Sequence, residues 1–219
     1  MNTYAVINNM KMTCHQGFTL LELLITVSIA GILLAIGIPS FSSMMTETRI
    51  SAQYNSLVSS LYHARSEAIK GAADVTVCPK NAIDGTQCGD INDWQNGWIV
   101  FTDSINVPNE ATASIENQAD IISVKPAIKG LNTVTSFGST TNVVSNVAAV
   151  NYVRYLQNGS SSMTTGSIVI CDITRGAADS RALNIVRTGD IRRGTVTEGS
   201  TAPRDVFNRP ISPLCPEPT

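Results

Sequence analysis

The sequence is poor in the residues on which most enzyme and metal sites depend. It has only two histidines among 219 residues, His15 and His63. It contains no Cys-x-x-Cys pair, phosphate-binding loop, dinucleotide-binding glycine pattern or nucleophile motif. We therefore expect no enzymatic activity, no metal site and no cofactor.

Charge is also scarce: charged residues make up 15 % of the chain, and the net charge is −2. This balance does not indicate a general nucleic-acid-binding protein. The charges are unevenly placed. The segment 71–174 has four basic and nine acidic residues, whereas the segment 175–219 has seven arginines, no lysine and five acidic residues. Such asymmetry predicts a C-terminal surface with a partner of its own.

Apolar sequence is abundant near the N-terminus, where residues 18–38 contain a single charge, Glu22. A helix of that length is about 30 Å long, the thickness of the hydrocarbon core of a bilayer. A cleaved secretory signal has a shorter apolar run and ends in a small-x-small site, whereas this run ends at Pro39. The segment therefore predicts a transmembrane helix. A carboxylate at the centre of such a helix costs roughly 2.5–3.5 kcal/mol, so Glu22 either has a role or reaches the interface from the first turn.

The string HQG-FTLLELLITVSIAGILLAIGIPSF, at 15–41, resembles the N-terminus of type IV pilins and type II secretion pseudopilins. The resemblance implies a prepilin leader over 1–17, cleavage between Gly17 and Phe18, and methylation of Phe18. It gives Glu22 and Pro39 the places of the assembly glutamate and the helix-kinking proline. It also implies two kinds of partner, a prepilin peptidase and other major and minor pilins or pseudopilins. The chain would be a single-pass inner-membrane protein with a periplasmic C-terminal domain, and later part of a pilus or pseudopilus.

The sequence after Pro39 predicts a helix that continues to Gly71. Apolar residues recur at spacings of three and four and form one stripe: Ile50, Tyr54, Leu57, Leu61, Ala64 and Ala68. Arg49, Gln53, Ser56, Ser60 and Glu67 lie off this stripe. We expect the stripe to pack on a sheet; a coiled-coil seam is the alternative. Gly71 suits the C-terminal end of the helix.

From Ala73 onward the sequence pattern changes to short β-like runs separated by turn residues. The predicted strands are Val75–Cys78, Gly97–Thr102, Ile121–Lys125, Val150–Gln157, Ser167–Asp172 and Ala182–Arg187. The stretch 105–146 is polar, with weak strands at best, and the proline-rich tail 195–219 should be irregular. The predicted fold is α+β and pilin-like, with a long helix (18–71, transmembrane over 18–38) packed on a small antiparallel sheet in a β-rich domain (72–194).

Further sequence motifs restrict the resemblance to one branch of the pilins and pseudopilins. They are ARSEAIK at 64–70, VTVCP at 75–79, Trp94 ahead of GWIVFTD at 97–103, and IVICD at 168–172. Together they resemble the GspH/FimT-like branch of minor pilins and pseudopilins. This resemblance covers residues 18–104 and 150–194.

Four cysteines follow the apolar segment: Cys78, Cys88, Cys171 and Cys215. An even number suits two disulfides in an oxidising compartment. Cys78 and Cys88 flank an Asp-Gly turn signal at 84–85, so a local disulfide is easy, which leaves Cys171 for Cys215; three pairings are formally open. Zinc and, through the acidic residues of 84–93, calcium are weaker interpretations, because neither ligand spacing is complete.

The branch includes DNA-uptake proteins in which Gly-Arg-x-Arg after the last strand binds DNA. The matching string here is Gly-Asp-Ile-Arg-Arg at 189–193, with aspartate in place of the first arginine. A phosphate-binding patch could still form from Arg187, Arg192, Arg193, Arg204 and Arg209. The function predicted first is a minor pilin that helps to initiate or cap a type IV pilus. The alternatives are a type II secretion pseudopilin and a DNA-binding minor pilin for transformation.

Overall fold

The computed structural model describes residues 18–103, 113, 115–128, 133–139, 151–162, 165–172, 176–194, 204 and 215. Its first element is a single helix, α1 (Leu20–Gly71). The chain divides into two compact units, one up to Met45 and one from Thr46 onward. The predicted helix is therefore present over nearly its whole expected length.

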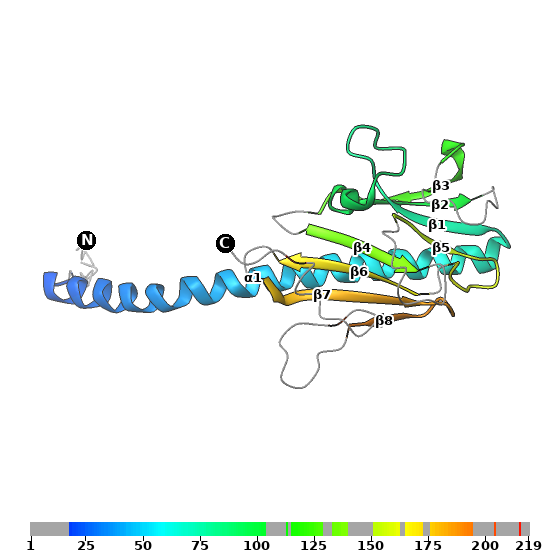
Figure 1. Cartoon of the computed structure of the whole chain (residues 1–219). Helices are drawn as coiled ribbons and strands as arrows, with labels where there is room; N and C mark the ends of the chain where they lie inside the picture. Colours follow the sequence, from blue (N-terminus) through cyan, green and yellow to red (C-terminus); the bar gives the residue numbers. More distant parts are fainter. Residues whose placement is uncertain are drawn as a thin grey trace, which may run out of the picture. The chain divides into compact units, whose positions relative to one another are not determined.

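The part of α1 in the second unit carries the predicted apolar stripe. Leu57, Leu61, Ala64 and Ala68 are fully buried and belong to the hydrophobic core, and Tyr54 packs against it. This part of the helix lies along the strands of the domain (Figure 1). The prediction that the stripe packs on a sheet is confirmed. Ser60, which the pattern left off the stripe, is also buried, and its hydroxyl donates to the Ser56 carbonyl at 3.0 Å.

The helix ends at Gly71, as the sequence predicts. Gly71 is the last helical residue, and the left-handed conformation that often closes a helix falls on Ala72, with φ of 48°. A residue with a Cβ is strained in that region, so the end of α1 stores strain that a glycine would avoid.

The first sheet has the strand order β3-β2-β1-β5 and is antiparallel throughout. Its strands are β1 (Asp74–Pro79), β2 (Trp98–Asp103), β3 (Ile121–Val124) and β5 (Val153–Tyr155). Two 3₁₀ helices accompany it, η1 (Ile91–Asn96) and η2 (Gln118–Asp120). Val75 and Val77 of β1 pair with Thr102 and Val100 of β2, and all six residues of β1 are buried.

The second sheet has the order β4-β6-β7-β8 and is also antiparallel. Its strands are β4 (Thr133–Ser139), β6 (Thr165–Asp172), β7 (Gly176–Val186) and β8 (Ile191–Arg193). Ile168 and Ile170 of β6, with Leu183 and Ile185 of β7, join Leu57 and Leu61 of α1 and Trp94, Trp98 and Val100 in one core. The α+β fold with a long helix on antiparallel strands is confirmed.

The strand predictions need three corrections. The strands form two sheets, not one. β4 lies in the stretch that was expected to hold weak strands at best, and β8 was not predicted at all. β4 consists mainly of polar and glycine residues, yet all seven of them pair with β6. Cross-strand pairing therefore forms a strand that local sequence preference does not indicate.

Candidate functional site

The start of α1 holds the residues expected to act in assembly. Thr19 caps the helix: its hydroxyl oxygen accepts a hydrogen bond from the Glu22 backbone N–H at 3.2 Å, and its carbonyl accepts one from the Leu23 N–H, also at 3.2 Å. The Thr-x-x-Glu spacing is that of a capping box, a signal our sequence reading overlooked. Gly17, the other half of the expected cleavage site, lies outside the described residues.

In the first unit α1 exposes a continuous apolar surface. Phe18 is 81 % exposed, and the large apolar side chains from Leu20 to Ile38 are all exposed. By length and composition, α1 is long and apolar enough to cross a membrane. The helix continues through Pro39. A surface of this kind needs an apolar environment or protein partners to cover it.

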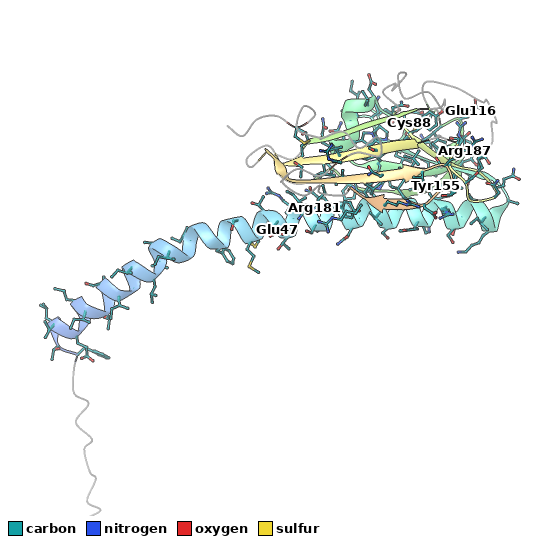
Figure 2. The ribbon with its side chains drawn as sticks, turned by 60° about the horizontal axis from the view of Figure 1, so that its bottom comes forward. Glu47, Cys88, Glu116, Tyr155, Arg181 and Arg187 are labelled. Atoms are coloured by element: carbon teal, nitrogen blue, oxygen red, sulfur yellow. A yellow bond between two sulfur atoms is a disulfide. The ribbon has the colours of Figure 1, made fainter. Side chains whose placement is uncertain are left out.

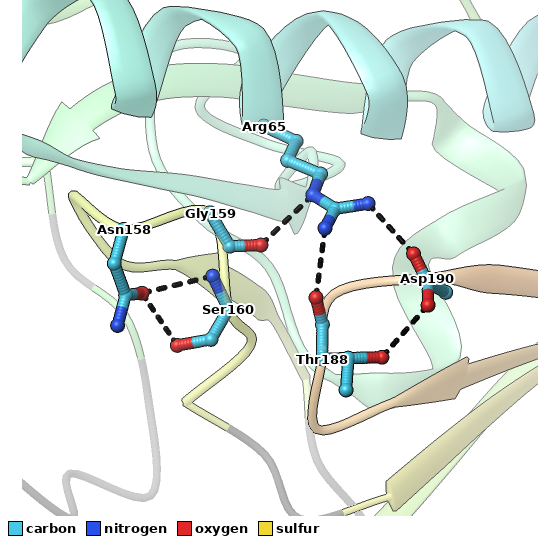
Figure 3. Close-up of polar contacts among 6 residues, drawn as sticks. All are labelled: Arg65, Asn158, Gly159, Ser160, Thr188 and Asp190. Atoms are coloured by element: carbon cyan, nitrogen blue, oxygen red, sulfur yellow. Dashed lines mark hydrogen bonds and ion pairs between the residues drawn. The ribbon is translucent and has the colours of Figure 1, made fainter.

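Arg65, on the domain part of α1, ties the helix to two turns (Figure 3). Its Nε donates to the Gly159 carbonyl at 2.8 Å, and its Nη2 donates to the Thr188 carbonyl at 2.8 Å. Its Nη1 lies 3.0 Å from Asp190 Oδ1 in an ion pair. We call this group of Arg65, Gly159, Thr188 and Asp190 the arginine clamp.

The turn glycines allow the clamp to close. Gly189 has φ of 80°, and a Cβ there would stand 2.1 Å from the Gly159 carbonyl oxygen. The two turns, one after β5 and one between β7 and β8, therefore touch through their backbones. The Thr188 hydroxyl donates to Asp190 Oδ2 at 2.9 Å. This bond first, and then Arg65, hold the pKa of Asp190 below its usual range.

The arginine clamp explains the departure from the Gly-Arg-x-Arg pattern. Asp190 stands where the DNA-uptake pattern has its first arginine, and here the position carries a carboxylate that binds Arg65. An arginine at that place would face the guanidinium of Arg65. In this chain the position therefore serves the packing of the β7–β8 turn on α1.

The candidate phosphate-binding arginines do not gather on one face of β8. Arg192 pairs with Asn184 and Arg193 with Leu183 across the sheet, and neighbouring residues of a strand point to opposite faces. Leu183 belongs to the core that contains Leu57 and Leu61 of α1, so Arg193, its cross-strand partner, lies on the helix side. The charge of Arg192 instead acts on Asp190.

The other arginines of that set are spread along the chain. Arg187 is exposed at the start of the β7–β8 turn, and Arg204 is half-buried, with its carbonyl accepting from Asn184 Nδ2 at 3.4 Å. Arg209 lies outside the described residues. Arg181, not in the predicted set, reaches Glu47 of α1 at 3.5 Å (Figure 2).

Comparison with known proteins gives the family. The family model described as Type II transport protein GspH matches residues 53–189, more than half of the chain. The chain belongs to the GspH family. A second model, the prokaryotic N-terminal methylation motif, matches residues 12–38. The comparison with curated proteins finds no match.

Among solved structures, the chain resembles the type IV minor pilin FimU of Pseudomonas aeruginosa in two crystal forms. For the P21 form the identity is 15 %, the TM-score is 0.45, and the match covers 69 % of this chain and 92 % of that one. For the P65 form the identity is 16 %, the TM-score is 0.42, and the match covers 67 % of this chain and 93 % of that one.

Two disulfides brace the GspH domain. One joins Cys78 to Cys88, with Cα atoms 5.5 Å apart, and the other joins Cys171 to Cys215, with Cα atoms 5.4 Å apart. These are the pairings favoured from the sequence. The second one attaches Cys215, in the proline-rich tail, to β6.

A buried ion pair in the GspH domain escaped the sequence analysis. Arg154 Nη2 lies 2.6 Å from Asp103 Oδ2, and both side chains are less than a tenth exposed. Thr76 donates its hydroxyl to the same Asp103 oxygen at 2.9 Å and accepts from Arg154 Nε at 3.2 Å. The three residues come from β1, β2 and β5, so only the strand pairing brings them together. Neither this pair nor the clamp has a local sequence signal.

Proposed function

We propose that this GspH-family chain is a minor pilin that is built into a type IV pilus and helps to initiate or cap the filament. The observation that carries the proposal is the first part of α1. It exposes mostly apolar side chains, with Glu22 as its one charged residue between Leu20 and Ile38, and is continuous with a folded GspH domain. Such a segment suits a subunit that is stored in a membrane and then transferred to a bundle of like helices.

The proposed route begins with a prepilin peptidase. It removes residues 1–17 and methylates the new N-terminal Phe18, which agrees with the methylation motif matched over 12–38. Glu22 then pairs with the amine of a neighbouring subunit's first residue. Two opposite unit charges attract more strongly in a medium of low dielectric than in water. The desolvation penalty that Glu22 carries in a lone subunit is therefore offset on assembly.

The proposed location is the inner membrane, with α1 crossing it once and the β-rich domain in the periplasm. The two disulfides support an oxidising compartment for that domain. Major and other minor pilins are the proposed partners, through α1 in the filament core and through the domain surface.

A type II secretion pseudopilin is the second candidate. The description of the matching family model, a type II transport protein, favours it. The apolar helix and the methylation motif suit both machines equally.

The test is a deletion strain compared with wild type and with a complemented strain. Pilus yield on the cell surface and the amount of secreted exoproteins are measured in all three. Lost pili with normal secretion, restored on complementation, support the minor-pilin function. Normal pili with lost secretion support the pseudopilin, and normal values for both would contradict both functions.

A further inference from the structure

The strand β3 forms an open edge of the first sheet. In the order β3-β2-β1-β5 it has one neighbouring strand, β2, and it lies at the margin of that sheet (Figure 1). The Lys125 N–H, directly after β3, donates to the Trp98 carbonyl of β2 at 2.8 Å. In an antiparallel pair the backbone groups of successive residues point alternately toward the neighbour and away from it. The N–H and C=O of Val124 therefore point away from β2.

This edge is open to a partner at Val124. The side chain is 46 % exposed, and within the described part of the chain no residue bonds to the two outward backbone groups. Proteins often protect an edge strand with charged residues or proline inside the strand. The sequence of β3, Ile-Ile-Ser-Val, contains neither. The edge can therefore accept hydrogen bonds from another strand and donate to it.

Two charges of opposite sign flank the edge. Asp120 directly precedes β3 and Lys125 directly follows it, and neither forms an ion pair with another described residue. β3 is short, and a bulge leaves Ile122 as an extra residue opposite β2, so an added strand gains few main-chain bonds. The two end charges should therefore decide which strand pairs here and in which direction.

We propose that β3 binds an extended segment of a partner protein, which joins the first sheet as an antiparallel strand. Antiparallel pairing places the start of the segment opposite the end of β3. The segment should thus begin with an acidic residue facing Lys125, continue with apolar residues, and end with a basic residue facing Asp120. In strand addition of this kind the main chain gives affinity and the side chains give specificity. The pairing does not depend on which filament the chain serves.

The geometry argues against a second copy of this chain as the occupant. Two copies that join their β3 strands antiparallel are related by a two-fold axis perpendicular to the sheet. Such an axis reverses every direction in the plane of the sheet, so the domain parts of the two α1 helices, which lie along the strands, would point in opposite directions (Figure 1). Copies anchored in one membrane share one direction. This step alone rests on the proposed membrane anchor.

The first test compares two peptides of equal composition, acetyl-EVTVTVK-amide and acetyl-KVTVTVE-amide. The full-length protein is held in lipid nanodiscs with ¹⁵N-labelled valine. We expect a saturable shift of the Val124 N–H signal with the first peptide and binding about tenfold weaker with the second, whose end charges face like charges. Equal binding of the two peptides, tighter binding of the second, or no saturable shift with either would overturn the proposal.

Variants of the edge test the backbone contact. Val124→Pro removes the outward N–H and no bond to β2, and proline is tolerated at a sheet edge in that position. It should abolish binding of a fluorescent first peptide, measured by anisotropy. Val124→Thr keeps the N–H and the branched side chain, so it should bind as wild type does. Urea unfolding checks that both variants fold. A folded Val124→Pro protein with unchanged affinity would refute the site.

The end charges have a test that does not depend on the proline variant. Asp120→Lys with Lys125→Asp exchanges the two charges and should make the second peptide the tighter ligand. An unchanged preference would contradict the proposed direction of pairing.

The last arm concerns the second copy. Energy transfer between donor-labelled and acceptor-labelled copies in one bilayer should be the same for wild type and Val124→Pro. A loss of transfer in Val124→Pro would show that β3 binds another copy, and the partner-protein proposal would fail.

Discussion

Arg65 Nη1 lies 3.0 Å from Asp190 Oδ1, across 125 positions of sequence. Through this pair α1 is joined to the turn between β7 and β8, and through Gly159 to the turn that follows β5. One side chain of the helix thus connects both sheets of the domain.

Removing the donors of Arg65 should destabilise the domain. Arg65→Met keeps the aliphatic stem and loses all three hydrogen bonds, and we expect the free energy of unfolding to fall by about 2 kcal/mol. Asp190→Arg should be more harmful than Asp190→Asn, because it places two guanidinium groups together. Urea unfolding followed by circular dichroism measures this. Arg187→Met, at an exposed neighbouring arginine, is the control, and an Arg65→Met protein as stable as this control would contradict the role of the clamp.

Glu22→Ala should leave membrane insertion and leader cleavage intact but reduce incorporation into filaments. We expect a loss of about tenfold or more, since a contact worth about 1.4 kcal/mol changes an association constant tenfold. Immunoblots of sheared filaments and of membranes measure the two pools. Glu67→Ala, at a carboxylate on the domain part of α1, is the control. Normal incorporation of the Glu22 variant would remove the proposed pairing with the N-terminal amine.

The Arg154–Asp103 pair should show strong coupling. Asp103→Leu or Arg154→Met alone leaves a buried charge without its partner, which typically costs about 3–5 kcal/mol. The double variant should lose much less than the sum of the two. The exposed pair Lys70–Glu67, at 3.4 Å, gives the comparison cycle and should couple by at most about 1 kcal/mol. Additive losses at Arg154 and Asp103 in urea unfolding would show that the pair is not coupled.

Ala72→Gly should stabilise the protein. Relief of the left-handed strain is worth about 1 kcal/mol, partly offset by the greater freedom of glycine in the unfolded chain. Ala52→Gly, in the exposed middle of α1, is the same substitution and should instead destabilise by about 1 kcal/mol. The two midpoints of thermal unfolding should move in opposite directions; movement in the same direction would argue against strain at Ala72.

The carboxyl of Asp74 should make the stability of the protein fall as the pH rises, the reverse of the usual effect of a carboxyl group. Burial raises its pKa, against the hydrogen bond from the Gln157 N–H and the charge of Arg154. A carboxyl with a raised pKa binds its proton more tightly in the folded state, so its contribution to stability falls as the pH rises from about 4 toward neutrality. Asp74→Asn does not titrate, and its stability relative to wild type should increase over that range.

For Asp84→Asn, the stability difference from wild type should depend on pH with the opposite sign. Hydrogen bonds from the Thr86 hydroxyl and N–H lower the pKa of Asp84, so wild type should lose its advantage over this variant as the pH falls below about 4. Denaturant unfolding at several pH values measures both differences. A pH-independent difference for Asp74→Asn would mean that its carboxyl titrates alike in both states.

Local patterns predicted the helix and its buried face well, because the spacing of Leu57, Leu61, Ala64 and Ala68 is set by the helical period alone. Most strands followed from runs of β-branched residues. The limits of the strands did not: the predicted Val150–Gln157 contains β5, which covers only Val153–Tyr155, whereas the predicted Ala182–Arg187 is the end of a longer β7.

What could not be predicted depends on partners distant in sequence. β4 owes its strand to pairing with β6, and the division into two sheets depends on which strands meet. The arginine clamp and the Arg154–Asp103 pair arise in the same way. Thr19 is different, since its capping signal was present in the sequence and was overlooked.

The Cys171–Cys215 bond has a mechanical consequence. It joins residues separated by 44 positions, so β7 and β8 lie inside a covalent ring. If a filament is stretched between the helix and the C-terminal end of a subunit, tension passes from Cys215 directly to β6. The disulfide prevents the residues inside the ring from being pulled out under that tension. Fully extended, they would add about 150 Å, at about 3.4 Å per residue. Such a subunit resists lengthening under load even when its last two strands loosen.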